Sequence, residues 1–94
     1  HRAVLKLGVC LVRQHKYDDA IIFLRQGVNR FPNQPELLIN LAGVLIEKQR
    51  TDEAKPIIER LTMMEQDGLI VDSSIRGQVI NLASILARRY SKEP

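Results

Sequence analysis

Apolar side chains recur every three or four residues along most of the chain, which is the spacing of one face of an α-helix. Five segments follow this pattern, and they span residues 1–14, 17–31, 35–48, 51–64 and 73–90. No segment shows the sustained alternation of apolar and polar residues that is typical of a strand. The pattern therefore predicts an all-α chain of five helices without a sheet.

Short polar residues and prolines separate the segments and predict where helices end. The first helix is expected to stop near His15, a residue type that tolerates a left-handed backbone conformation. Pro32 and Asn33 close the second segment. Pro35 fits the first turn of the third helix, where its missing N–H costs little. We expect Asp18 and Asp19 to open the second helix, and candidate N-caps of the later helices are Thr51 or Asp52, and Asp72, Ser73 and Ser74.

The longest break in the helical pattern lies between the fourth and fifth segments. A loop is expected over residues 65–72, where the dipeptide Asp67-Gly68 is a strong turn signal. Three apolar residues at positions 69–71 are expected to fold back onto the core. Cys10 is the single cysteine and is flanked by apolar residues, so we expect it to be buried as a small apolar side chain.

The first 34 residues recur, degraded but in register, over the next 34. The matched pairs include Leu7 with Leu41, Gly8 with Ala42, Ala20 with Ala54 and Leu24 with Ile58. The tripeptide Asn81-Leu82-Ala83 repeats Asn40-Leu41-Ala42 at a spacing of 41, so about seven residues are inserted before this third, partial copy. A fixed period between roughly 20 and 50 residues predicts a stacked-repeat architecture. Such architectures form binding surfaces for partners more often than active sites.

We therefore expect a single domain over residues 1–94. It comprises a first repeat (1–34), a second repeat (35–68), a loop insertion at about 65–74 and a half-repeat or capping helix at about 73–91. Small residues at 8, 20, 42, 54 and 83 allow helices to approach closely, and large residues at 7, 24, 41 and 58 fill the layers between them. Because the opening helix is apolar around most of its circumference, we expect it to be buried on more than one side. This favours the middle or end of a longer array.

These residues resemble the tetratricopeptide repeat. The first copy reads Val4-x-x-Leu7-Gly8-x-x-Leu11, then Ala20-x-x-x-Leu24, Gly27 and Pro32, and the second supplies Leu38, Leu41, Ala42, Leu45, Ala54 and Ile58. The resemblance covers nearly the whole chain as about two and a half helix-turn-helix repeats. It implies an α-α superhelix whose concave wall is built from the first helix of each repeat.

The resemblance also implies a binding surface and a function. It places these residues on the concave wall: Leu5, Val9, Val12, Ile39, Asn40, Gly43, Ile46 and Asn81. An apolar groove of this kind suits an amphipathic helix or an extended peptide, and the asparagines would bond the partner's backbone. The implied function is a protein–protein interaction scaffold or adaptor that binds another protein or peptide.

Two alternatives are open for this surface. The wall residues would instead pack against a neighbouring repeat if the chain is a structural fragment of a longer array, or one that self-associates into a homo-oligomer. The two asparagines would then be solvent-exposed or helix-bridging. The carboxylate-tail clamp of some family members is not expected, because its matching positions read Leu5, Val9, Asn40, Gly77 and Asn81, and only Asn40 fits.

Composition and motifs argue against two other functional classes, nucleic-acid binding and catalysis. A net charge of +3 and a pI near 9.4 permit nucleic-acid binding, but only 4% of the residues are aromatic, so base-stacking side chains are scarce. The two histidines, His1 and His15, stand in no metal-ligand spacing, and no Gly-rich phosphate loop or nucleophile elbow is present. We therefore expect no enzyme, metal or cofactor, and nucleic acid is a weaker alternative partner.

The compartment is left open by the sequence. No apolar run approaches the roughly 20 residues that span a bilayer, and no targeting signal is visible. The sequence begins at His1 rather than at a methionine, so an upstream signal is compatible with it. The cytoplasm is slightly favoured, and a periplasmic or exported location follows if such a signal was removed.

Overall fold

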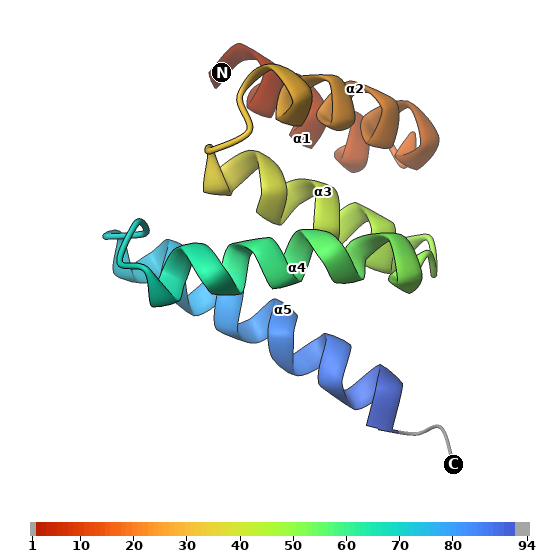
Figure 1. Ribbon diagram of the computed structural model, residues 1–94. Coiled ribbons are helices and arrows are strands. Elements are labelled where there is room, and N and C mark those ends of the chain that lie inside the picture. Colours follow the sequence, from red (N-terminus) through yellow and green to blue (C-terminus); the bar gives the residue numbers. More distant parts are fainter. Residues whose placement is uncertain (1, 92–94) are drawn as a thin grey trace.

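Residues 2–91 form five helices joined by short connections (Figure 1). The structure, a computed structural model, describes residues 2–91, with side chains from residue 3 to residue 89. The helices are α1 (Arg2–Arg13), α2 (Tyr17–Arg30), α3 (Pro35–Glu47), α4 (Thr51–Gln66) and α5 (Ser73–Ser91). Within this range there is no strand, so the predicted all-α fold is confirmed.

The helices are stacked as two antiparallel hairpins and one further helix. Figure 1 shows α1 paired with α2, α3 paired with α4, and α5 packed beneath the second hairpin. The first helices of successive units also touch, because α3 contacts both α1 and α5. Helix α3 therefore lies at the centre of the molecule and contacts all four other helices. Within residues 2–91 no helix combines the length and the apolar character that crossing a bilayer requires.

The hydrophobic core follows from this central position of α3. Eight of its residues are buried: Leu37, Leu38, Ile39, Leu41, Ala42, Val44, Leu45 and Ile46. The second helices contribute the matching small and large residues: Ala20 and Leu24 from α2, and Ala54 and Ile58 from α4. The repeated pairs of small and large residues thus form the interface within each hairpin.

Glycines let α1 and α2 approach closely. A Cβ atom on Gly8 would lie 2.6 Å from Cδ2 of Leu24, and one on Gly27 would lie 2.5 Å from Cγ1 of Val4. Both distances are far below van der Waals contact, so a larger residue would force Leu24 or Val4 to move or the two helices to separate.

The helix ends use one backbone motif three times. His15 and Gln49 have positive φ angles of 60° and 59°, and Gly68 has φ of 74°. After α1, the N–H of His15 donates to the carbonyl of Val12 and that of Lys16 to the carbonyl of Leu11. This is the Schellman pattern, and the same pair of bonds recurs at Gln49 and at Gly68. The expected left-handed end at His15 is confirmed, and Gln49 occupies the same position 34 residues later.

Of the predicted N-caps of the later helices, one is wrong and one is confirmed. Neither Thr51 nor Asp52 caps α4, because the capping position is Arg50 and makes no side-chain cap bond there. Asp72 does cap α5: its Oδ1 accepts the backbone N–H of Ser74 at 2.8 Å and of Ile75 at 3.4 Å.

The loop before α5 is shorter than expected. Helix α4 continues to Gln66, so the connection spans residues 67–72. Only Ile70 folds back onto the core, with 4% of its surface exposed, whereas Leu69 and Val71 are 65% and 89% exposed. Three successive residues of an extended connection cannot all face the core, and the central one does.

The expectation that α1 is buried on several sides is wrong. Gly8 is its one fully buried residue among those whose side chains are described. Leu7, expected to fill a layer, is 46% exposed, and Cys10 is exposed rather than buried. The reason is that, among the described residues, α1 contacts α2 and α3 alone, which leave much of its surface uncovered.

Candidate functional site

A groove runs along the face formed by α1, α3 and α5. It encloses about 330 Å³ and is lined by Val12 from α1, by Ile39, Asn40, Gly43, Val44 and Glu47 from α3, and by Gln78, Asn81 and Leu82 from α5. We call these nine residues the interhelix groove. It forms because three successive first helices lie side by side, so that one edge of each contributes to a shared surface.

The structure brings five of the eight sequence-predicted residues together in this groove. They are Val12, Ile39, Asn40, Gly43 and Asn81. Ile46 is 7% exposed and belongs to the core instead. Leu5 and Val9 lie half-buried on α1 outside the lining of the groove.

Gly43 is the open point of the groove. A Cβ atom built at this position would meet no heavy atom within 4 Å, because the space above the α3 backbone is empty. Val12, Ile39 and Leu82 contribute apolar surface to the same groove. The groove can therefore receive an apolar side chain from a partner close to the α3 backbone.

Asn40 is partly committed to its own helix. Its Nδ2 donates to the backbone carbonyl of Glu36 at 2.8 Å, which uses one of the two N–H groups of the amide. Asn81 is exposed on α5, on the opposite wall of the groove. The two amides thus stand on neighbouring helices at one opening.

The groove continues into a more polar recess. This recess holds about 340 Å³ and shares Asn40 and Gln78 with the interhelix groove. Its other lining residues are Glu36, Asp72, Ser74 and Ile75. Three carboxylates line the groove and the recess: Glu36, Glu47 and Asp72. Among the described residues, no lysine or arginine lines the groove or the recess. The charge at the site is therefore negative although the whole chain is basic.

Sequence reasoning missed Val44, Gln78 and Leu82. Gln78 lies three residues before Asn81, a separation that places both side chains on one face of α5. That spacing was a usable signal for Gln78. Val44 and Leu82 read as core positions, and 4% and 8% of their surfaces are exposed.

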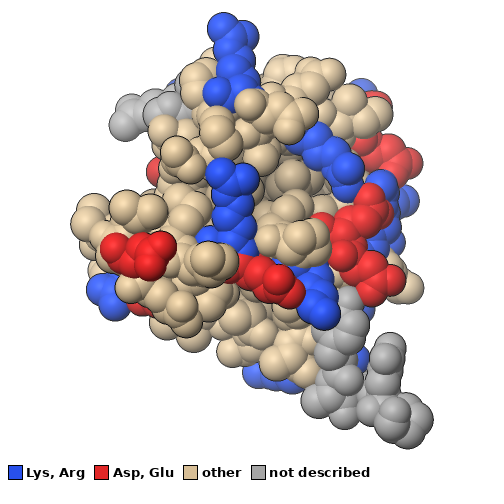
Figure 2. Space-filling model, viewed as in Figure 1, with Lys and Arg blue, Asp and Glu red and all other residues tan. Residues whose placement is uncertain are grey.

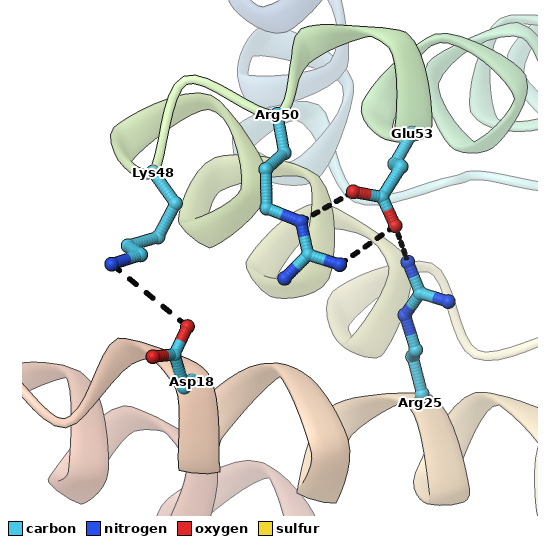
Figure 3. Close-up of polar contacts among 5 residues, drawn as sticks. All are labelled: Asp18, Arg25, Lys48, Arg50 and Glu53. Carbon is cyan, nitrogen blue, oxygen red and sulfur yellow. Dashed lines mark hydrogen bonds and ion pairs between the residues drawn. The ribbon is translucent and has the colours of Figure 1, made fainter.

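Polar contacts away from the groove tie the hairpins together, as Figure 3 shows. Arg25 on α2 donates to Oε1 of Glu53 on α4 at 2.6 Å, and Arg50 donates to both oxygens of the same carboxylate. Nζ of Lys48 lies 3.8 Å from Oδ1 of Asp18. These hydrogen bonds lower the pKa of Glu53, mainly through Arg50 and then Arg25, and Glu53 in turn raises the pKa of Arg50. We interpret the cluster as structural, because it joins α2 to α4 outside the groove.

The charged surface does not resemble a nucleic-acid site on the face drawn in Figure 2. Acidic and basic side chains there lie next to one another, without a continuous basic patch. Elsewhere, Arg76 at the start of α5 pairs with Glu65 of α4 at 3.2 Å.

Residues with catalytic or metal-binding potential are scattered. Nδ1 of His15 lies 3.0 Å from the hydroxyl of Tyr17, at the turn between α1 and α2. Across residues 2–91 no three His, Cys, Asp or Glu side chains are grouped so that they could hold a metal ion.

The chain was compared with families of known proteins, with curated sequences and with solved structures. A family model described as tetratricopeptide repeat matches residues 11–72, which extend from the last part of α1 to the residue before α5. No curated protein sequence and no solved structure matches the chain.

Proposed function

Because the chain belongs to the tetratricopeptide repeat family, whose repeats generally mediate interactions between proteins, we propose that the interhelix groove binds a peptide segment of a partner protein. Members of this family are typically non-enzymatic scaffolds, and we propose that role here. We further propose residues 1–34 and 35–68 as two repeats and α5 as the first half of a third.

The observation that carries this proposal is the open space above Gly43. At about 330 Å³, the groove lies at the lower end of the range for binding pockets. Its size and apolar wall suit one or two anchoring side chains of a peptide. Burial of one leucine-sized anchor would contribute about 1.5–3 kcal/mol.

The polar residues define the partner more closely. Asn40 and Asn81 stand on neighbouring helices, where their amides can bond the backbone of a segment lying across the groove. Glu36, Glu47 and Asp72 add negative charge beside the apolar surface. We therefore propose a partner segment with an aliphatic anchor next to a lysine or arginine.

A pair of leucine substitutions tests the proposal without disturbing the core. Gly43→Leu would fill the groove, since a Cβ there meets nothing within 4 Å. Gln26→Leu is the control, because Gln26 is exposed on α2 and does not line the groove or its recess. Peptides are first selected on the wild-type chain from a random display library. Their affinities for the three proteins are then measured by fluorescence anisotropy. Ile39 and Ile46 are unsuitable for this test because both are more than nine-tenths buried.

We expect Gly43→Leu to weaken binding at least tenfold, since it occupies the space of the anchor. Gln26→Leu should leave the affinity unchanged, and the selected peptides should carry an aliphatic residue beside a basic one. Equal affinities for all three proteins, or selection of acidic peptides, would contradict the proposal.

A further inference from the structure

Four residues of α3 form a line along the interhelix groove and its polar recess. They are Glu36, Asn40, Gly43 and Glu47, and their separations of four, three and four residues place them on one face of the helix. Glu36 lines the recess, Glu47 lines the groove, and Asn40 lines both. We call these four residues the α3 line. It carries a carboxylate at each end, with the open position Gly43 between them.

The carboxylates at the two ends are available to a ligand. In the described part of the chain, no salt bridge involves Glu36 or Glu47, and both residues are exposed. Asp72 adds a third carboxylate to the recess and is exposed as well. Away from the groove, by contrast, Glu53 and Glu65 both pair with arginines. The site therefore offers unneutralised negative charge at both ends of the α3 line.

The space between these charges independently suits a ligand. A Cβ atom on Gly43 would meet nothing within 4 Å, and Val12 and Leu82 add apolar surface to the same groove. Asn40 donates its Nδ2 to the carbonyl of Glu36, which leaves its Oδ1 as an acceptor. A ligand lying along the α3 line thus meets an acidic end, an amide, an apolar opening and a second acidic end in that order.

The geometry of a helix converts the α3 line into distances. At a rise of 1.5 Å per residue, Gly43 lies about 10 Å along the axis from Glu36 and about 6 Å from Glu47. A peptide whose backbone bonds the asparagine amides is extended, because a helix uses its backbone groups internally. An extended chain advances about 3.3 Å per residue. These distances therefore correspond to about three residues on one side of the anchor and at most two on the other.

We propose that the recess at Glu36 and Asp72 binds a second lysine or arginine of the partner peptide, three residues from the aliphatic anchor. This second basic residue lies on the opposite side of the anchor from the basic residue that meets Glu47. The proposal rests on the proposed function, since it requires a peptide in the interhelix groove. It adds a spacing: basic, two further residues, aliphatic, then basic within two residues. The same spacing applies in either direction of the peptide chain.

Protein variants that each remove one charge test this spacing. Glu36→Gln and Asp72→Asn act on the recess, and Glu47→Gln acts on the other end of the α3 line. Asparagine caps helices as well as aspartate does, so Asp72→Asn retains the cap of α5. Glu59→Gln is the control, because Glu59 is exposed on α4 and lines neither the groove nor the recess.

The probes are peptides selected on the wild-type chain, resynthesised with each basic residue replaced in turn by glutamine. Fluorescence anisotropy gives the Kd of every pair of protein and peptide. A basic residue that contacts a given carboxylate loses its effect on affinity when that carboxylate is removed, which identifies the contact.

We expect one basic residue, three positions from the aliphatic anchor, to depend on the recess. Its replacement should weaken binding to the wild-type and Glu59→Gln proteins about two- to fivefold, as for an exposed ion pair. The same replacement should leave binding to the Glu36→Gln/Asp72→Asn double variant unchanged. The basic residue on the other side of the anchor should lose its effect on Glu47→Gln instead.

Two results would overturn this proposal while the peptide site remains. One is a set of selected peptides without a basic residue at the three-residue spacing. The other is a basic residue at that spacing whose replacement weakens binding equally to the double variant and the wild type. In both cases Gly43→Leu still weakens binding. Undiminished binding to Gly43→Leu would instead contradict the proposed function, and the second basic site would fall with it.

Discussion

Glycine has opposite roles at two pairs of positions in this chain. Gly8 and Gly27 are required by contact, because the side chains of Leu24 and Val4 occupy the space that a Cβ would need. Gly43 and Gly77 are in open surroundings. A glycine inside a helix lowers the free energy of unfolding by about 1 kcal/mol relative to alanine. No close contact requires a glycine at Gly43 or Gly77, so packing does not account for this loss of stability. At Gly43 the same absence of a side chain opens the groove.

Alanine substitutions separate these two roles. Gly77→Ala should raise the free energy of unfolding by about 0.5–1 kcal/mol, because it gains helix propensity without a clash. Gly8→Ala should lower it by about 1 kcal/mol, since overpacking against the fully buried Leu24 outweighs the same gain. Urea denaturation followed by circular dichroism measures both. A Gly8→Ala protein as stable as Gly77→Ala would show that the α1–α2 spacing is not tight.

Sequence reasoning worked well for single residues with a strong backbone signature and poorly for exposure. His15 and Pro35 were identified at helix ends, because few residue types suit those backbone conformations. Cys10 and Leu7 were expected to be buried and are exposed. An apolar side chain in the sequence indicates only that burial would be favourable. Whether another helix covers that side chain depends on how the helices stack.

At the scale of helices, the hairpins are joined by an apolar interface and by the charged cluster of Figure 3. Arg25 of α2 and Arg50 before α4 both donate to Glu53. All three side chains are between 38% and 46% exposed, so water screens their attraction. The cluster therefore orients α4 against α2, while the apolar residues of α3 provide most of the stabilisation.

The pH dependence of stability follows from the lowered pKa of Glu53. A carboxylate with a lower pKa in the folded state stabilises the fold above its unfolded-state pKa of about 4.5, and the stabilisation is lost as pH falls through the folded-state value. Glu53→Gln should therefore reduce stability near pH 7 and matter progressively less as pH drops below about 4.5. Urea midpoints of both proteins across this range give the comparison. Glu59→Gln on the same helix controls for the change in net charge, and a pH-independent effect of Glu53→Gln would refute the assignment.

The helices themselves were largely predictable, since a period of three to four residues and clear end signals define each of them. The fourth helix was predicted two residues too short, because Glu65 and Gln66 carry no apolar signal although they continue the backbone of α4. Residues 69–71 of the loop that follows were expected to fold back onto the core, but of these only Ile70 is buried. Successive side chains of an extended segment point to opposite sides, so the neighbours of a buried residue face the solvent.

For the whole molecule, the 34-residue period and the family match agree on the stacked hairpin architecture. Five of the eight candidate site residues meet in one groove because the repeat places equivalent edges of α1, α3 and α5 side by side. Ile46 does not join them, since α3 is central and its flanks are covered. The acidic recess also could not be read from the sequence, because Glu36 and Asp72 come together only through the packing of α5 on α3.

The most direct test of the central claim is the location of a bound peptide on the chain. A peptide selected on the wild-type protein is titrated into uniformly ¹⁵N-labelled protein, and amide shift changes are mapped by NMR. We predict the largest changes along α1, α3 and α5, at Val12, Asn40, Gly43 and Asn81. Changes confined to the outward surfaces of α2 and α4, with Gly43 and Asn81 unaffected, would contradict the account.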